Sequence, residues 1–167
     1  MSVKVGDAAP VVTVDAYIRD EAHPIRVEVG GAAESWTVLF FYPRDFTFLC
    51  PTELRGFAEL QASFALEGAS VIAASTDSWH VHRAWLETSL GLTGIRYPVL
   101  ADPDQELTAA YGVLDMEDGS ALPATFVIDS SGTVRDVSIA GPGTRRRPEE
   151  TLETLRELRM GELQAVA

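Results

Sequence analysis

The most apolar stretch of the chain runs from Thr37 to Tyr42 and reads TVLFFY. A run of this kind, without the alternation of a half-exposed strand, is typical of a central strand that is buried on both faces. It is too short to cross a membrane. Pro43 is expected to end the strand, because proline has no N–H group to donate to a sheet ladder.

A second apolar run, Val71 to Ala74, predicts another buried strand. Between the two runs, four apolar residues recur at mostly helical spacing: Leu54, Phe57, Leu60 and Phe64. They predict a helix from Pro51 to about Glu67, with Gly68 as its C-terminal stop. Since strand–helix–strand connections are right-handed, segments 37–42 and 70–74 are expected to be parallel neighbours.

The rest of the pattern predicts shorter elements. These are a turn and a strand within 3–14, a strand Ile25–Val29 paired with it, a helix from Trp79 to about Ser89 with Ser78 as its N-cap, a loop over 96–103, a helix over 104–111, a polar turn over 115–120, a hairpin of strands 125–129 and 134–139, and a last helix from near Pro148. This order indicates an α/β sandwich with a mixed central β-sheet flanked by helices.

Composition narrows the class of protein. The 167 residues predict a single domain over 1–167, and the net charge of −12 argues against nucleic acid and anionic membrane surfaces as partners. The N-terminus lacks the pattern of a signal peptide. With only three histidines, no histidine-rich metal site is expected, and no cofactor is predicted. The single cysteine is typical of a reducing compartment, so we expect the cytoplasm.

That cysteine, Cys50, directly precedes Pro51. Proline favours the first turn of a helix, so Cys50 is predicted to lie at a helix N-terminus that follows a buried strand. The helix dipole and the free amide groups there favour a thiolate over a thiol. The alternative is a buried structural cysteine, which packs like a small apolar side chain.

The surrounding residues, Tyr42-Pro43-x-Asp45-Phe46-Thr47-Phe48-x-Cys50-Pro51-Thr52-Glu53-Leu54, resemble the active-site loop of the peroxiredoxins, most closely their alkyl hydroperoxide reductase (AhpC-type) branch. The resemblance continues in Ser75-Thr76-Asp77, His82-x-Ala84-Trp85, Tyr97-Pro98, Ala101-Asp102-Pro103 and Thr125-Phe126-Val127-Ile128-Asp129, and it covers roughly residues 3 to 155. It implies a thioredoxin-like fold and a homodimer or a ring of dimers. Phe46, Phe48, Trp79 and Trp85 are candidates for the contact surface.

The resemblance also implies roles for individual residues. Cys50 would attack a peroxide and become a sulfenic acid. Thr47 would hold the thiolate and the substrate through its hydroxyl group, and Pro43 would shield the thiolate, although a threonine in a turn and a proline after a strand also have plain structural roles.

Four supporting residues follow from the same resemblance. Glu53 would pair with an arginine, for which Arg146 is the best match, although the run Arg145-Arg146-Arg147 would otherwise be a solvated basic patch. Trp85 would form an apolar wall near the cysteine or take part in a subunit contact. His82 is predicted to be structural, because the sequence shows no fixed carboxylate partner for it.

Two features depart from the family pattern. The tail from Met160 onward has no second cysteine to resolve a sulfenic acid, so an external thiol would have to reduce it. Pro123 stands where peroxiredoxins place an arginine, and this loss is expected to raise the pKa of the cysteine and slow peroxide reduction unless Arg44 or Arg146 reaches the site. Pro123 also resembles the cis-proline that faces the cysteine in thioredoxin-like thiol oxidoreductases. Because X–Pro bonds are the ones in which the cis form is routine, we expect Leu122–Pro123 to be cis.

Three functions remain open at this stage. The first is a one-cysteine peroxidase that acts on hydrogen peroxide or organic hydroperoxides. The second is a recruited fold that performs thiol–disulfide exchange or a biosynthetic reaction in the same pocket, and Pro123 is the reason to consider it. The third is a non-catalytic redox sensor or binding protein, against which stands the presence of Pro43, Thr47 and Cys50.

Overall fold

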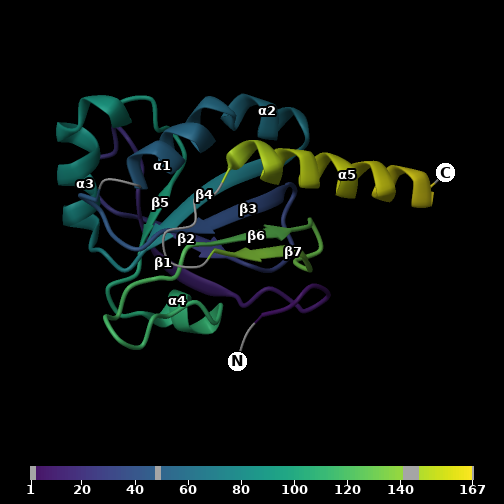
Figure 1. Ribbon diagram of the computed structural model, residues 1–167, viewed down its shortest axis with the longest axis horizontal. Helices are drawn as coiled ribbons and strands as arrows, with labels where there is room; N and C mark the ends of the chain where they lie inside the picture. Colours follow the sequence, from purple (N-terminus) through teal and green to yellow (C-terminus); the bar gives the residue numbers. More distant parts are fainter. Residues whose placement is uncertain (1–2, 48–49, 141–146, 167) are drawn as a thin grey trace.

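The computed structural model describes residues 3–47, 50–140 and 147–166 (Figure 1). Its strands are β1 (Val12–Tyr17), β2 (Ile25–Val29), β3 (Trp36–Phe41), β4 (Ala69–Ser75), β5 (Val99–Ala101), β6 (Ala124–Ile128) and β7 (Val134–Ile139). Its helices are α1 (Cys50–Glu59), α2 (Gln61–Leu66), α3 (Trp79–Thr88), the short 3-10 helix η1 (Leu90–Leu92), α4 (Glu106–Ala110) and α5 (Pro148–Val166).

The strands form one mixed sheet in the order β2-β1-β5-β4-β3-β6-β7. β4 is parallel to both β3 and β5, and the other neighbouring pairs are antiparallel. The predicted pairings of β1 with β2, β3 with β4 and β6 with β7 are therefore confirmed. β5 lies within the segment 96–103 that was predicted to be a loop, and that prediction was wrong. Three buried residues are too few to give a periodic pattern, and only the pairing with β1 and β4 makes this segment a strand.

The sheet is covered on both faces, and the side chains of β3 alternate between the two apolar cores on these faces. Val38 and Phe40 belong to one apolar core, while Leu39 and Phe41 belong to the other. Because successive side chains of a strand point to opposite faces, a strand buried on both sides needs the continuous apolar run that the sequence has here.

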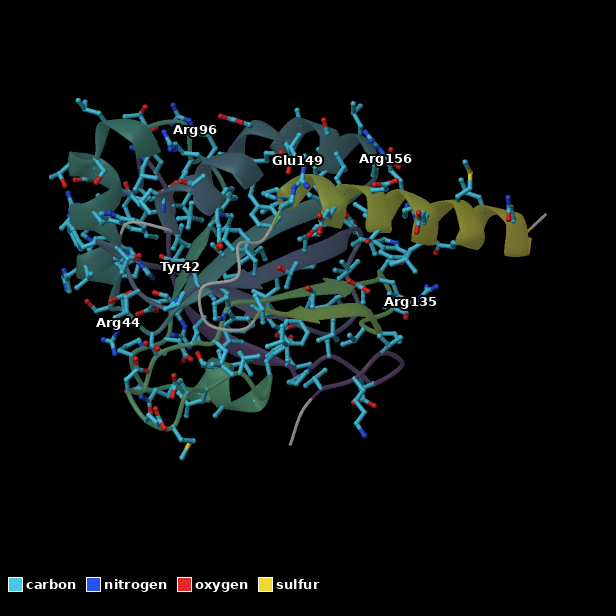
Figure 2. All side chains as sticks on the ribbon, in the orientation of Figure 1. Tyr42, Arg44, Arg96, Arg135, Glu149 and Arg156 are labelled. Atoms are coloured by element: carbon cyan, nitrogen blue, oxygen red, sulfur yellow. The ribbon has the colours of Figure 1, made fainter. Side chains whose placement is uncertain are left out.

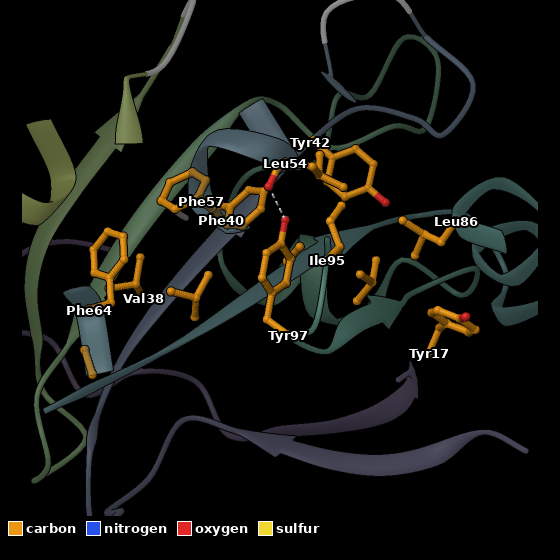
Figure 3. Close-up of a cluster of buried hydrophobic side chains, with 14 of the residues drawn as sticks. Tyr17, Val38, Phe40, Tyr42, Leu54, Phe57, Phe64, Leu86, Ile95 and Tyr97 are labelled. Carbon is orange, nitrogen blue, oxygen red and sulfur yellow. Dashed lines mark hydrogen bonds between the residues drawn. The ribbon is translucent and has the colours of Figure 1, made fainter. Parts of the chain in front are cut away.

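The larger core lies between the sheet and helices α1, α2, α3 and α5 (Figure 3). Phe40 stacks on Phe57 of α1 with ring centroids 4.1 Å apart. The Tyr97 hydroxyl donates to the Leu54 carbonyl oxygen at 2.8 Å, the dashed line in Figure 3. Each fully buried aromatic side chain of this kind contributes about 1.5–3 kcal/mol, so α1, which begins with Cys50, is fixed firmly against the sheet.

The long helix predicted from Pro51 to Glu67 is instead two helices, and the prediction of one helix was wrong. The chain bends at Leu60, which has φ −98° and ψ 2°. With this bend, Phe57 and Phe64 stack with centroids 6.0 Å apart and both are fully buried. Side-chain packing in the core thus accompanies a bend that helical spacing alone does not reveal. Gly68 follows with φ +77°, as expected of a helix stop.

α4 packs on the opposite face, where Leu107 and Tyr111 join the second core. The Tyr111 hydroxyl donates to the Pro10 carbonyl oxygen at 2.9 Å, and burial raises the pKa of this tyrosine. Ser78 caps α3 as predicted, since its hydroxyl oxygen accepts from the Val81 N–H at 3.2 Å. Leu152 and Leu155 of α5 are buried, while the end of this helix extends past the sheet in Figure 1. Among the described helices, none has both the length and the apolar composition of a membrane span.

Candidate active site

Cys50 is the first residue of α1, and the chain reaches it from the carboxyl end of β3. The predicted position at a helix N-terminus is therefore confirmed; the cysteine side chain lies outside the described part. The first N–H groups of a helix have no partner within the helix, and with the dipole they favour an anion at this end. Because α1 spans ten residues and is packed on the sheet, the position has the full field of an established helix. This is a place where a thiolate is stabilised.

The segment between β3 and α1 is described over residues 43–47. Pro43 is half-buried and follows the strand that it was predicted to end. Thr47 donates its hydroxyl hydrogen to the Arg44 carbonyl oxygen at 3.2 Å, which closes a turn. The turn-stabilising role of Thr47 is thus present, and its hydroxyl oxygen can still accept a hydrogen bond.

Glu53 lies in the first turn of α1 with only 7% of its surface exposed, where a carboxylate suits the helix dipole. One turn later, α1 touches the start of α5: a Cβ atom on Gly56 would lie 2.8 Å from Cγ of Pro148. The open groove beside this contact, of about 540 Å³, includes Glu53 and Arg147 in its lining. Arg146 lies outside the described residues, so its pairing with Glu53 stays a prediction.

Trp85 is buried, with 3% of its surface exposed. Its ring centroid lies 6.1 Å from that of Tyr42 and 6.0 Å from that of Phe46. The structure therefore places Trp85 as an apolar wall under the loop that leads to Cys50. Trp85 and Trp79 are both buried by their own chain, which leaves little of either ring open to a second subunit. Their part in a subunit contact surface stays a prediction.

Among the aromatic residues predicted for that surface, Phe46 is the one that the structure describes as exposed, with 62% of its surface open. It also has φ +60°, a left-handed conformation that is uncommon outside glycine. Phe48 lies outside the described residues.

Pro123 is half-buried and directly precedes β6, whose first residue, Ala124, pairs with Phe41 at the end of β3. Pro123 therefore lies at the sheet edge from which the Cys50 loop departs. The Leu122–Pro123 bond is trans, so the prediction of a cis bond was wrong. The physical reason is that trans is the lower-energy form of an X–Pro bond. On either side of the bond, the Leu122 N–H donates to the Val113 carbonyl oxygen at 2.7 Å and the Pro123 carbonyl oxygen accepts from the Ala140 N–H at 2.8 Å.

Arg44 was considered as a source of the positive charge that Pro123 cannot supply. Its guanidinium donates to the Asp118 carbonyl oxygen at 2.9 Å and lies 3.7 Å from the Asp118 carboxylate. Hydrogen bonds from Ser120, and then the charge of Arg44, lower the pKa of that carboxyl group. Figure 2 shows Arg44 at the periphery of the molecule. In this structure Arg44 therefore ties the loop to the turn at 115–120.

A buried polar network next to the loop was missed by the sequence analysis. The Tyr42 hydroxyl donates to Oδ1 of Asp45 at 2.5 Å, and Nδ1 of His82 lies 2.6 Å from Oδ2. The expectation that His82 has no fixed carboxylate partner was wrong. Burial, followed by the charge and hydrogen bond of Asp45, raises the pKa of Tyr42 well above its ordinary value.

Asp77 extends this network. Its Oδ2 accepts from the Asp45 N–H at 2.9 Å and from the Ser75 hydroxyl at 2.7 Å. Asp45, Asp77 and His82 offer three ligand atoms within 4.8 Å of one another. However, Nδ1 of His82 and Oδ2 of Asp45 are at hydrogen-bonding distance and bind each other. Asp45 and Asp77 follow the carboxyl ends of β3 and β4, which are parallel neighbours and end at the same edge of the sheet. This placement was the signal in the sequence from which the network could have been predicted.

Known proteins resemble this chain over nearly its whole length. The model of the AhpC/TSA family matches residues 5–137. The protein YkuU of Bacillus subtilis is 37% identical over 163 residues, which cover 95% of this chain and 91% of that protein. A thioredoxin peroxidase of Echinococcus granulosus is 37% identical over 158 residues, covering 93% of this chain and 81% of that protein. The crystal structure of Enterococcus faecalis AhpC superposes with a TM-score of 0.89 at 33% identity, covering 96% of this chain and 94% of that one.

Proposed function

This chain belongs to the AhpC/TSA family of peroxiredoxins and is an oxidoreductase of the peroxidase type, and we propose that Cys50 is its peroxidatic residue. The observation that carries the proposal is the position of Cys50 as the first residue of α1, behind a loop with Pro43 and Thr47. There the helix N-terminus favours the thiolate, which is the nucleophilic form.

The proposed reaction transfers one oxygen atom. The Cys50 thiolate attacks one oxygen of hydrogen peroxide or of an organic hydroperoxide, an S–O bond forms, and the O–O bond breaks. The leaving oxygen takes up a proton and departs as water or an alcohol, and the cysteine is left as a sulfenic acid. The sulfur is oxidised and the peroxide is reduced, so no cofactor is needed.

Thr47, Glu53 and Trp85 support this step in the proposal, Trp85 as the apolar wall under the loop. Thr47 has a hydroxyl oxygen that can accept a hydrogen bond beside the reacting atoms. Glu53, buried in the first turn of α1, would hold Arg146 near the thiolate. A guanidinium in that place would supply some of the positive charge that Pro123 does not, which matters because fixed donors around a developing anion contribute strongly to rate.

The second half of the cycle requires external thiols. Cys50 is the single cysteine of these 167 residues, so the sulfenic acid cannot form a disulfide within them. One external thiol would condense with the sulfenic acid and release water, and a second would displace Cys50 and form the external disulfide. Such a cycle fits a reducing compartment such as the cytoplasm.

We also propose a homodimer or a ring of dimers, with the exposed ring of Phe46 in a contact between copies. Sedimentation velocity of the wild type and of Phe46→Ser tests this directly. A smaller assembly in the variant is expected, and an identical distribution would remove Phe46 from the contact.

Intact-mass spectrometry tests the reaction. The reduced protein is mixed briefly with stoichiometric hydrogen peroxide or cumene hydroperoxide, with Cys50→Ser as the matched control. We expect a rapid gain of one oxygen atom in the wild type alone, reversed by added thiol. A wild-type protein that gains oxygen no faster than free cysteine would contradict the proposal and favour a different reaction in the same pocket.

A further inference from the structure

The loop that leads to Cys50 is held from the interior through Asp45, whose side chain is fully buried. Its carboxylate binds the Tyr42 hydroxyl at the end of β3 and Nδ1 of His82 on α3, at 2.5 and 2.6 Å. Its main-chain N–H donates to Asp77, between β4 and α3, at 2.9 Å. Three separate segments therefore converge on one residue of the loop, five positions before the cysteine.

The imidazole of His82 is itself fixed at both nitrogens. It is fully buried, and Nε2 lies 2.9 Å from the carbonyl oxygen of Leu100 in β5. A carbonyl oxygen only accepts, so Nε2 carries a hydrogen. One further proton must lie between Nδ1 and Oδ2 of Asp45, because two acceptors do not approach to 2.6 Å without one. The ring thus links β5, an interior strand of the sheet, to the loop by two hydrogen bonds with different partners.

The loop needs such an anchor because of its backbone. Phe46, next to Asp45, has φ +60°, which a non-glycine residue keeps only where its surroundings hold it. Its own side chain is largely exposed, so burial of the ring does not account for the conformation. Asp45, directly before Phe46, makes hydrogen bonds to Tyr42, His82 and Asp77. Thr47, the next residue, closes the turn with its hydrogen bond to Arg44.

We infer that His82 is a positioning residue for the reaction at Cys50: through its Nδ1 hydrogen bond to Asp45 it holds loop 43–47 in the geometry that peroxide reduction requires. This inference rests on the proposed function. His82 touches neither the substrate nor the sulfur in this account. Its hydrogen bond to Leu100 fixes the ring, and its hydrogen bond to Asp45 acts on the loop.

Two amide substitutions at His82 each remove one of its two hydrogen bonds and keep the other. In His82→Asn the side-chain nitrogen takes the place of Nδ1, so a donor to Asp45 is kept and the bond to Leu100 is lost. In His82→Gln the nitrogen reaches the place of Nε2, so the bond to Leu100 is kept and the donor to Asp45 is lost. Both variants are neutral, and each loses one buried hydrogen bond, so a merely structural role predicts similar effects.

The measurement is the second-order rate constant of Cys50 with hydrogen peroxide, divided by its rate constant with iodoacetamide, which needs no shaped pocket. We expect this ratio to fall by roughly tenfold to a hundredfold in His82→Gln, as for other small displacements of reacting groups. His82→Asn is expected to recover most of that loss. Tyr42→Phe, which removes another bond to the same carboxylate at nearly constant shape, is expected to lower the ratio as well, and it provides a test if His82→Gln does not fold.

Three results would overturn the inference. The first is an equal ratio in the wild type and all folded variants, and the second is an equal loss in His82→Asn and His82→Gln. The third is a wild-type protein that reacts with peroxide no faster than free cysteine. That third result removes the proposed function itself, whereas the first two leave it intact and remove only the role of His82.

Discussion

Replacement of Asp45 by alanine is expected to destabilise the protein strongly, while replacement by asparagine is not. The alanine variant leaves two buried donors, the Tyr42 hydroxyl and the His82 ring, without an acceptor. Each unsatisfied buried donor costs about 1–3 kcal/mol. Because two such donors are left in the core, we expect a loss of about 4 kcal/mol in the free energy of unfolding.

The asparagine variant keeps the shape and the hydrogen bonds. Its amide oxygen accepts from Tyr42, and its amide nitrogen donates to Nδ1 of a neutral His82 ring, whose Nε2–H still binds Leu100. Because each buried donor keeps an acceptor in this variant, the expected loss is about 1 kcal/mol or less.

Urea unfolding at about pH 7 measures both values, with the three tryptophans as the fluorescent probe and the m-value as a check on two-state behaviour. Two outcomes would refute the reasoning. A loss below about 1 kcal/mol in Asp45→Ala would mean that water replaces the lost carboxylate. Equal losses in both variants would mean that attraction between charges, rather than hydrogen bonding, stabilises the network.

Three further predictions concern stability away from the site. Arg19→Ala removes three hydrogen bonds from the guanidinium to the carbonyl oxygens of Leu86, Leu92 and Ile95. We expect urea unfolding to show a loss of about 2–4 kcal/mol in the free energy of unfolding, of which Arg19→Lys recovers less than half. Burial raises the pKa of Asp129, but hydrogen bonds from the turn after it and from Arg135 outweigh burial and lower the pKa below 3.8. The ionised carboxylate therefore stabilises the fold above that pH. Asp129→Asn should be less stable than the wild type at about pH 7, and the difference should shrink as the pH falls below 3.8. Gly30→Ala places Cβ 2.2 Å from the Pro10 carbonyl oxygen at φ +83°, and its thermal unfolding should reveal a loss of roughly 3 kcal/mol or more; an unchanged melting temperature would contradict the fold at this turn.

The parts of the fold that the sequence predicted correctly carry local signals. The apolar run of β3, the Cys50–Pro51 step and the serine cap at Ser78 each depend on neighbours a few residues away. They appeared where expected, within one or two residues. The segment that became β5 had no such signal, because its three residues form a strand only between β1 and β4.

In the candidate site, too, only the features with a local signal in the sequence could be predicted. The position of Cys50 follows from the strand before it and the proline after it. The partnership of Asp45 with His82 joins residues 37 positions apart, and it exists only because α3 packs beside the loop. The expected cis bond at Pro123 failed because trans is the lower-energy form of an X–Pro bond, and the contacts of this segment with Val113 and Ala140 also lie outside its local sequence. Long-range contacts of this kind leave no local pattern in the sequence.

The central claim is that Cys50 reduces peroxide although Pro123 supplies no guanidinium. The most direct measurement is the second-order rate constant of the fully reduced protein with hydrogen peroxide, obtained by rapid mixing and compared with free cysteine at the same pH. The account predicts a rate constant on the order of a hundredfold or more above that of free cysteine, since fixed electrostatic stabilisation is worth that much, and no reaction in Cys50→Ser. A rate constant equal to that of free cysteine would contradict it.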